Sequence, residues 1–130
     1  MRFDRITTPS RLIQHGEVHG LAVCDFNGDG FDELYLTAYG GNAFWHNCGD
    51  GTFSDVTEAT GTKVLKWSTC AAFGDLNGDG FLDLYVTNFL EASDETPRLC
   101  PNSASPDGYV QCSPAIFEDV GDVLFIMLTA

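Results

Sequence analysis

The segment Asp25-Phe-Asn-Gly-Asp-Gly-Phe-Asp-Glu-Leu-Tyr-Leu-Thr37 returns fifty residues later as Asp75-Leu-Asn-Gly-Asp-Gly-Phe-Leu-Asp-Leu-Tyr-Val-Thr87. Nine of these thirteen positions are identical, and the same offset pairs Phe3 with Phe53 and Ile6 with Val56. A register this long indicates an internal repeat of about fifty residues. A period of that length, with several short strands in each repeat, is typical of the blades of a β-propeller.

The length of 130 residues predicts a single β-repeat domain over residues 1–130. A third repeat begins late in the chain, because Ile116–Val120 resembles Thr52–Val56. The added spacing before it falls in a proline-containing stretch, which we interpret as an inserted surface loop. The predicted units are repeat one at about 3–52, repeat two at about 53–115 with the inserted loop at 91–113, and a partial third repeat at 116–130.

Short runs of apolar, small or alternating residues predict strands, and no stretch shows a sustained helical period. The repeat phasing also predicts strands at Phe3–Thr7 and Ile116–Val120. The fold class is therefore all-β, with two propeller-blade-like repeats plus part of a third, too few for a closed propeller. The other predicted strands are 20–24, 33–38, 42–46, 52–56, 68–73, 83–87 and 122–129.

Each repeated loop has the pattern D-x-N-x-D-G-x-x-[D/E] and leads directly into a strand. Alternate residues of such a loop can turn oxygen atoms toward one ion, and a glycine after the third ligand allows the sharp turn. Calcium prefers several oxygen ligands in a flexible cage, so the sequence predicts two Ca²⁺ sites. The predicted ligands are Asp25, Asn27, Asp29, the Phe31 carbonyl and Glu33 in one loop, and Asp75, Asn77, Asp79, the Phe81 carbonyl and Asp83 in the other.

An EF-hand and a simple hairpin turn are the two alternatives to a calcium loop of this kind. An EF-hand needs a bidentate Glu at the twelfth position and a following helix, whereas Leu36 and Val86 occupy that position here. The ninth residue therefore closes each site. A single Asn-Gly-Asp-Gly would usually be only a hairpin turn, but two copies with carboxylates at positions one, five and nine favour calcium. Glu33 is longer than Asp83, and its extra reach can change how it coordinates the ion.

The formal net charge of −13 argues against nucleic acid and anionic membranes as partners, since phosphate binding needs clustered Lys and Arg. It fits a protein that binds hard cations. The first residues carry no apolar leader segment, and the longest apolar run, Val123 to Leu128, is too short to span a bilayer. We therefore expect no membrane insertion, and the sequence leaves open whether the chain is complete or a piece of a longer product.

Five cysteines are present and none forms a C-x-x-C pair, which argues against zinc or thioredoxin-like chemistry. Cys100 and Cys112 flank a loop rich in Pro, Ser, Asn and Gly, and a disulfide there would stabilise the fold by about 3 kcal/mol on the chain-entropy model. The alternative is that all five thiols are reduced and buried.

The sequence resembles FG-GAP/VCBS repeats, the calcium-binding blades found in integrin alpha-subunit propellers. Trp67 to Asn88 and Gly49 to Gly61 are similar to the secreted, cartilage-acidic-protein-like branch. The resemblance implies an extracellular or cell-surface protein with structural calcium, and adhesion or binding more often than catalysis. Family propellers need about seven blades, and the segments 91–113 and 121–130 match the repeat poorly.

Two blades alone would leave large apolar faces exposed. The chain is then a fragment of a full propeller, an elongated two-blade fold, or a unit that stacks head to tail with copies of itself. The phasing of its ends would let one copy add a strand to a neighbour, and we expect self-association into a homo-oligomer or surface filament.

A monomeric module that binds a glycan or surface protein is the alternative, with Tyr39, Trp45 and Trp67 as candidate stacking residues. Core packing is the more usual role of such side chains. A propeller enzyme is disfavoured, because the histidines, His15, His19 and His46, lack a partnered Ser or Cys motif.

Overall fold

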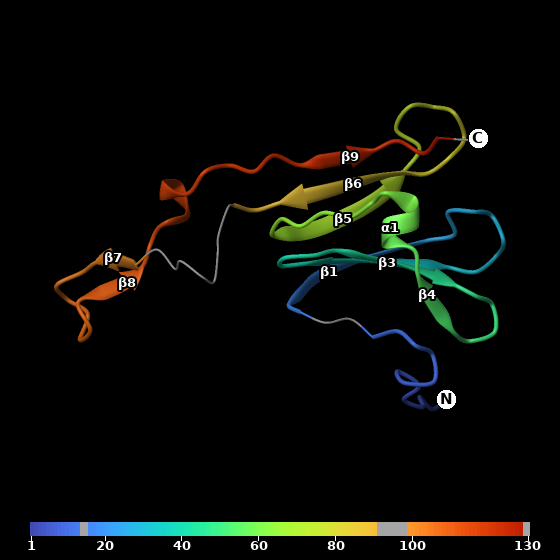
Figure 1. The fold of residues 1–130 in the computed structure, drawn as a ribbon, viewed down its shortest axis with the longest axis horizontal. Coiled ribbons are helices and arrows are strands. Elements are labelled where there is room, and N and C mark those ends of the chain that lie inside the picture. Colours follow the sequence, from blue (N-terminus) through green and yellow to red (C-terminus); the bar gives the residue numbers. More distant parts are fainter. Residues whose placement is uncertain (14–15, 91–98, 129–130) are drawn as a thin grey trace.

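Two antiparallel sheets pack face to face in this computed structural model, which describes residues 1–13, 16–90 and 99–128 (Figure 1). The first sheet has the order β1-β2-β3-β4 and the second the order β5-β6-β9. This confirms the all-β prediction of partial, propeller-like blades that do not close. The elements are β1 Val18–Cys24, β2 Glu33–Ala38, β3 Ala43–Asn47, β4 Phe53–Asp55, α1 Thr57–Thr60, β5 Ser68–Gly74, β6 Asp83–Asn88, β7 Leu99–Pro101, β8 Tyr109–Gln111, the 3₁₀ turn η1 Pro114–Ile116, and β9 Val123–Phe125.

The two sheets begin in the same way, as the sequence repeat requires. β1 pairs with β2 so that Cys24 lies opposite Glu33, and β5 pairs with β6 so that Gly74 lies opposite Asp83. In both cases the connecting loop is one of the two acidic repeats. Each loop is thus held between the first two strands of its own sheet.

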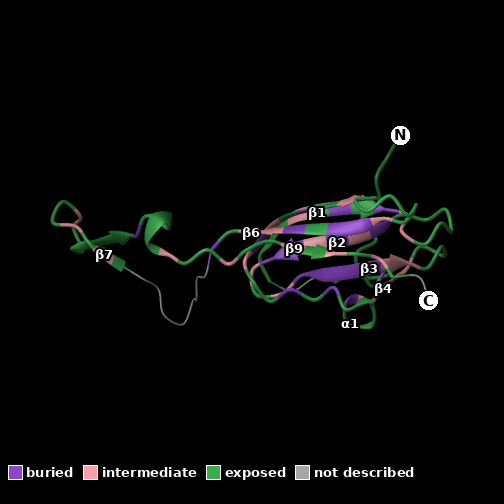
Figure 2. Cartoon of the chain, turned by 90° about the horizontal axis from the view of Figure 1, so that it is seen from above, coloured by how far each residue is buried: buried purple, intermediate pink, exposed green. Residues whose placement is uncertain are grey.

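The core lies between the sheets (Figure 2). Side chains in a strand alternate between the two faces of a sheet, so each sheet turns one apolar row toward the other. The first sheet contributes Ala22, Tyr35 and Phe44, and the second contributes Leu84 and Val86. Burying this area is the main favourable term that holds the two sheets together.

The inner strands β1 and β5 lie unusually close, and a glycine makes this possible. A Cβ atom on Gly20 would sit 2.7 Å from the Thr37 hydroxyl and 2.8 Å from the Thr69 carbonyl oxygen across the interface. Only a residue without a side chain fits that gap. The residue at position 20 therefore limits how closely β1 and β5 can approach.

A buried polar network centred on Asn42 also joins the sheets. Its Oδ1 accepts from the Ala38 backbone N–H at 2.9 Å, and its Nδ2 donates to Ser68 Oγ at 2.9 Å and to Tyr35 Oη at 3.2 Å. Tyr35 Oη in turn donates to the Thr62 carbonyl at 2.8 Å. Since Ser68 starts β5, this network fixes one sheet relative to the other.

Three strand predictions need correction. Phe3–Thr7 and Ile116–Val120 form no strand, although the repeat phasing predicted both. A strand needs a neighbour for its backbone hydrogen bonds, and neither segment pairs with any of the described strands. The last strand is β9, Val123–Phe125, shorter than the predicted 122–129, and it pairs with β6 of the second sheet. Residue 129 lies outside the described residues.

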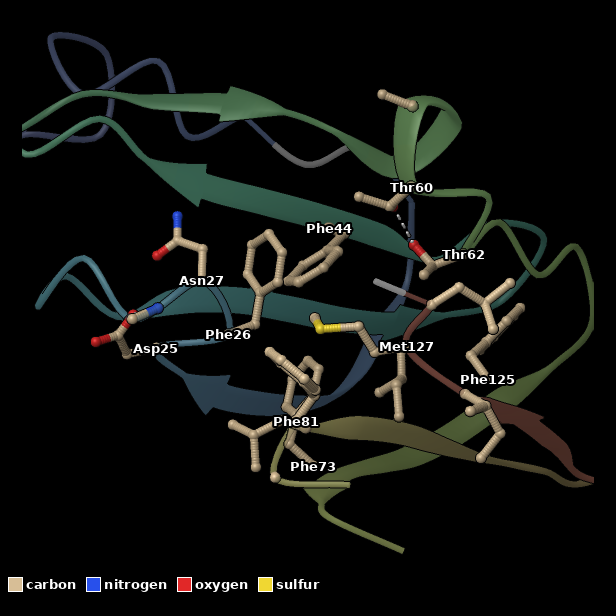
Figure 3. A pocket seen from close by; sticks show the side chains of 17 residues that line it. Asp25, Phe26, Asn27, Phe44, Thr60, Thr62, Phe73, Phe81, Phe125 and Met127 are labelled. Atoms are coloured by element: carbon tan, nitrogen blue, oxygen red, sulfur yellow. Dashed lines mark hydrogen bonds between the residues drawn. The ribbon is translucent and has the colours of Figure 1, made fainter. Parts of the chain in front are cut away.

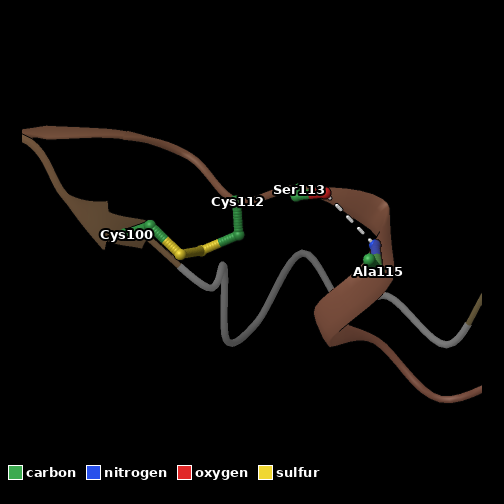
Figure 4. The surroundings of a disulfide bond; sticks show 4 residues. All are labelled: Cys100, Cys112, Ser113 and Ala115. Carbon is green, nitrogen blue, oxygen red and sulfur yellow. Dashed lines mark hydrogen bonds between the residues drawn. A yellow bond between two sulfur atoms is a disulfide. The ribbon is translucent and has the colours of Figure 1, made fainter.

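The second half of the predicted inserted loop is a hairpin set apart from the two sheets (Figure 1). Residues 91–98 of that loop lie outside the described residues. β7 pairs with β8, and a disulfide joins Cys100 to Cys112 beside it, with the two Cα atoms 5.0 Å apart (Figure 4). The predicted Cys100–Cys112 pairing is confirmed, and the alternative of five reduced thiols is wrong. Of the remaining cysteines, Cys24 is buried.

Within the described ranges, no helix has the length and apolar character that crossing a membrane would require.

Candidate functional site

The first acidic loop is curled around its first residue. Asp25 Oδ1 accepts hydrogen bonds from the backbone N–H groups of Gly28 at 2.8 Å and Asp29 at 3.0 Å, and Oδ2 accepts from Gly30 at 2.9 Å. Gly28 and Gly30 have φ of 75° and 88°, in the left-handed region that glycine adopts without strain. One carboxylate therefore organises the backbone of the whole turn.

The second loop repeats this geometry almost atom for atom. Asp75 Oδ1 accepts from Gly78 at 2.7 Å and Asp79 at 3.1 Å, and Oδ2 accepts from Gly80 at 2.9 Å. The two glycines again have positive φ, 80° and 89°. Identical residues at a fifty-residue offset thus adopt the same local structure. A simple hairpin turn would not need one carboxylate to accept three backbone hydrogen bonds.

The third and fifth residues of each loop also act as a pair. Asn27 Nδ2 donates to Asp29 Oδ2 at 2.9 Å, and Asn77 Nδ2 donates to Asp79 Oδ2 at 2.8 Å. The other carboxylate oxygen of Asp29 accepts from the Phe31 N–H at 2.8 Å. The side-chain oxygens of positions one, three and five are therefore held on a single small loop, and their role as metal ligands stays a prediction.

The ninth residue of each loop, Glu33 or Asp83, is fully buried and hydrogen-bonds back to the start of the loop. Glu33 Oε2 accepts from the Phe26 N–H at 3.1 Å, and Asp83 Oδ2 accepts from the Leu76 N–H at 3.0 Å. The longer Glu33 side chain thus reaches the same backbone position in its loop as Asp83 does. The two loops differ in the partner of the second carboxylate oxygen of this ninth residue.

Glu33 Oε1 lies 2.9 Å from His46 Nδ1, a residue of β3. The corresponding oxygen of Asp83 instead accepts from the Met127 N–H at 3.0 Å, just past β9. No site role for His46 could be predicted from the sequence, since only the pairing of β2 with β3 brings this residue beside the loop. The contact gives His46 a hydrogen-bonding role beside the loop.

The donor set fits a hard divalent cation. Carboxylate and amide oxygens dominate both loops, and one ligand atom from each of Asp29, Glu33 and His46 lies within 4.8 Å of the other two. In the part of the chain that the structure describes, no Lys or Arg forms an ion pair with a loop carboxylate. A bound cation would supply that missing positive charge and bind the loop oxygens together. The carbonyl roles of Phe31 and Phe81 stay predictions.

The carboxylates of the first loop already influence a neighbouring thiol. Cys24 is the last residue of β1 and is buried. Burial, followed by the charges of Glu33, Asp25 and Asp32, raises the pKa of the Cys24 thiol to about 12. This cysteine therefore stays a protonated, packed side chain at neutral pH.

An apolar cavity of about 760 Å³ opens between the two sheets next to the loops (Figure 3). Aromatic side chains from both sheets line it, and Asp25 and Asn27 stand at its rim. The cavity is a gap between two blades. Its labelled apolar side chains are Phe26, Phe44, Phe73, Phe81, Phe125 and Met127.

The candidate glycan-stacking residues all make packing contacts. Trp45 is buried. The Trp67 ring is surrounded by the rings of His19, Tyr39 and Phe89, with centroids 5.7, 5.5 and 5.4 Å away. These contacts agree with the packing role that the sequence favoured. His15 lies outside the described residues.

Comparison with known proteins finds one family. Residues 25–86 match the model of the FG-GAP-like repeat family. The match runs from Asp25, the first residue of loop one, to Val86 in β6, so it contains both acidic loops. The match suggests a β-propeller-type module, from a family that is structural or binding and not typically enzymatic. No curated protein and no solved structure matches the chain significantly.

Proposed function

We propose that this chain is a calcium-ordered structural or adhesion module of the cell exterior that associates with copies of itself. The observation that carries the proposal is the pair of matching loops, each with oxygen atoms at positions one, three, five and nine on one turn. Calcium would order the loops and tie the first two strands of each sheet together. It would act as a structural ion.

Removing the ion would leave seven formal carboxylates of the two loops crowded without a counterion. Charge repulsion then loosens the fold, because metal binding and folding are coupled where the site forms only in the native state. Affinity in the range of about 10⁻⁴ to 10⁻³ M is expected, as in other extracellular modules. The seven groups are Asp25, Asp29, Asp32, Glu33, Asp75, Asp79 and Asp83.

The cell exterior is proposed on two grounds. The disulfide between Cys100 and Cys112 suits an oxidising compartment. Weak calcium sites are filled only where calcium is plentiful, which is outside the cell. The resemblance to integrin-type and cartilage-acidic-protein-like blades points the same way.

Calcium titration by calorimetry tests the proposal. Two binding events are expected in the wild type, and one in Asp29→Ala or Asp79→Ala, because each substitution removes a central ligand of one loop. Asp107→Asn, outside both loops, is the control and keeps both events. A melting temperature that excess chelator leaves unchanged would count against structural calcium.

A further inference from the structure

The contact between the two sheets shows which surfaces of a blade fit together. We name the face of a sheet that carries the strand-two tyrosine its tyrosine face, and the opposite face its leucine face. The tyrosine face of the first sheet, with Ala22 and Tyr35, packs on the leucine face of the second, with Ala71, Leu84 and Val86. Both sides of this contact are buried.

The fifty-residue repeat places a second copy of each face on the outside. Tyr85 is the repeat counterpart of the fully buried Tyr35, yet it is 38% exposed, and Ala72 beside it is exposed. Leu21 is the counterpart of the buried Ala71, yet it is 54% exposed. The second sheet therefore has an exposed tyrosine face, and the first sheet has a leucine face on which Leu21 and Val23 of β1 are exposed, while Trp45 of β3 is already buried. These two surfaces are the counterparts of the two that pack together inside the chain.

The second sheet also lacks a strand that the first sheet has. β4 pairs with β3 at the outer edge of the first sheet, whereas β9, the counterpart of β3, is the last strand of the second sheet among the described residues. An unpaired strand edge is a template for strand addition. The missing element is a counterpart of β4.

The chain carries such an element at its N-terminus. Phe3–Arg5 lies fifty residues before Phe53–Asp55, which is β4, and Phe3 and Ile6 are 94% and 55% exposed. The turn that follows is also conserved in shape. Ser10 N–H donates to the Ile6 carbonyl at 2.8 Å, as Thr60 N–H donates to the Val56 carbonyl at 2.9 Å in the turn after β4.

We propose that copies of this chain join head to tail by continuing the internal blade contact. The leucine face of one copy's first sheet packs on the tyrosine face of another copy's second sheet. In the same contact, the first copy donates its Phe3–Arg5 segment as the fourth strand of the second copy's sheet, beside β9. This deepens the self-association part of the proposed function and identifies the partner as a second copy.

The register of the donated strand follows from the internal one. His46 pairs with Ser54 in the first sheet. Trp45 and Phe125 hold the same place, opposite Leu34 and Leu84, so Ile126 is the counterpart of His46. Shifting Ser54 back by fifty residues gives Asp4. The assembly therefore places Asp4 of one copy directly opposite Ile126 of the next.

One difference between the two repeats makes the proposed contact between copies looser than the contact between the two sheets of one chain. Cys70, the counterpart of Gly20, lies on the tyrosine face of the second sheet, opposite Thr87. A Cβ atom at Gly20 would lie 2.8 Å from a backbone oxygen of the opposing sheet, so the Cys70 side chain holds the next copy away from the same close approach. Cys70→Gly should tighten self-association by about tenfold, because it removes this overpacking.

The decisive experiment mixes two blocked copies in calcium and follows mass by sedimentation velocity. Leu21→Glu blocks only the leucine face and Ala72→Glu only the tyrosine face, so each variant alone should be a monomer. A head-to-tail contact lets the Leu21→Glu copy offer its tyrosine face to the Ala72→Glu copy. The equimolar mixture should then form dimers that cannot grow. Leu99→Glu, on the separate hairpin, is the control and should assemble like the wild type.

The strand register is tested by mixing Asp4→Cys copies with Ile126→Cys copies, with Cys48 and Cys70 changed to serine in both. Oxidation should link the two copies, and omitting either new cysteine should abolish the link. A disulfide formed inside one chain that carries both substitutions, at high dilution, would instead show that the N-terminal segment closes on its own β9 and would overturn the proposal.

Calcium titration of the same samples separates this proposal from the metal sites. A wild type that stays monomeric at micromolar concentration while binding two calcium ions overturns the association alone. Association that the Leu21→Glu substitution does not reduce, or blocked copies that do not pair with each other, would show a different interface and also overturn it.

Discussion

Asp83→Asn is the sharpest test of the closing ligand, because it removes charge while keeping size. Asp83 is fully buried, and each of its oxygens accepts one backbone N–H, from Leu76 at 3.0 Å and from Met127 at 3.0 Å. An amide has a single oxygen, so one of these N–H groups would face an NH₂ group. Leaving a buried donor unsatisfied costs about 1–3 kcal/mol, which is the loss expected without calcium.

A second loss should appear when calcium is added. A site filled at ten to a hundred times its dissociation constant stabilises the fold by about 1.4 to 2.7 kcal/mol. Asp83→Asn should lose that amount for the second loop and keep it for the first. Urea unfolding in chelator and in millimolar calcium measures both parts, since the free energy of unfolding extrapolates linearly with denaturant.

Asp32→Asn is the matched control, because Asp32 is an exposed loop carboxylate outside the predicted ligand set. It should change the free energy of unfolding little in chelator and keep the full response to calcium. If Asp83→Asn responded to calcium as strongly as the wild type, the ninth residue would not be a ligand. Equal stability in chelator would mean that its two backbone hydrogen bonds contribute nothing.

Three further outcomes are expected. Asn42→Ala should lower the free energy of unfolding by about 2–4 kcal/mol in a urea titration, since it breaks three buried hydrogen bonds and orphans a backbone N–H; a loss below 1 kcal/mol would show that the network is not structural. Gly20→Ala should lower the melting temperature through its clash with the opposing strand, whereas Gly41→Ala, where a Cβ meets open space, should not; equal effects would contradict the close approach. Alkylation of the native protein at pH 8, read by mass spectrometry, should spare Cys24, whose pKa is raised to about 12, and label the two exposed thiols; modification of all three at one rate would argue against its burial.

The local structure of the loops could be predicted from sequence because each is organised by short-range hydrogen bonds. Asp25 and Asp75 accept hydrogen bonds from backbone N–H groups three to five residues away, so the residues of the loop itself largely determine its conformation. His46 could not be predicted in the same way. Its contact with Glu33 depends on the pairing of β2 with β3, thirteen residues apart in the chain.

The errors at Phe3–Thr7 and Ile116–Val120 have a related cause. Both segments have the strand propensity and repeat phase of an outer blade strand, but a strand forms only where a sheet edge pairs with it. In this chain the edge beside Phe3–Thr7 would belong to a blade before the first sheet. The third-repeat boundary at 116–130 stays a prediction, while the structure pairs β9 with β6.

Comparing the burial of residues fifty positions apart therefore shows which surfaces of the chain lack a covering neighbour. Tyr35 and Tyr85 have the same sequence surroundings and the same strand position, so their different exposure reflects only what lies beside each sheet. Exposed Tyr85 has found a polar partner, donating to Asp122 at 2.6 Å, and this hydrogen bond lowers the pKa of Asp122. A neighbouring blade would cover that pair. Because the acidic loops occupy the ends of the strands and the exposed faces their sides, we expect ion binding at the loops and contact between blades to vary independently in the same molecule.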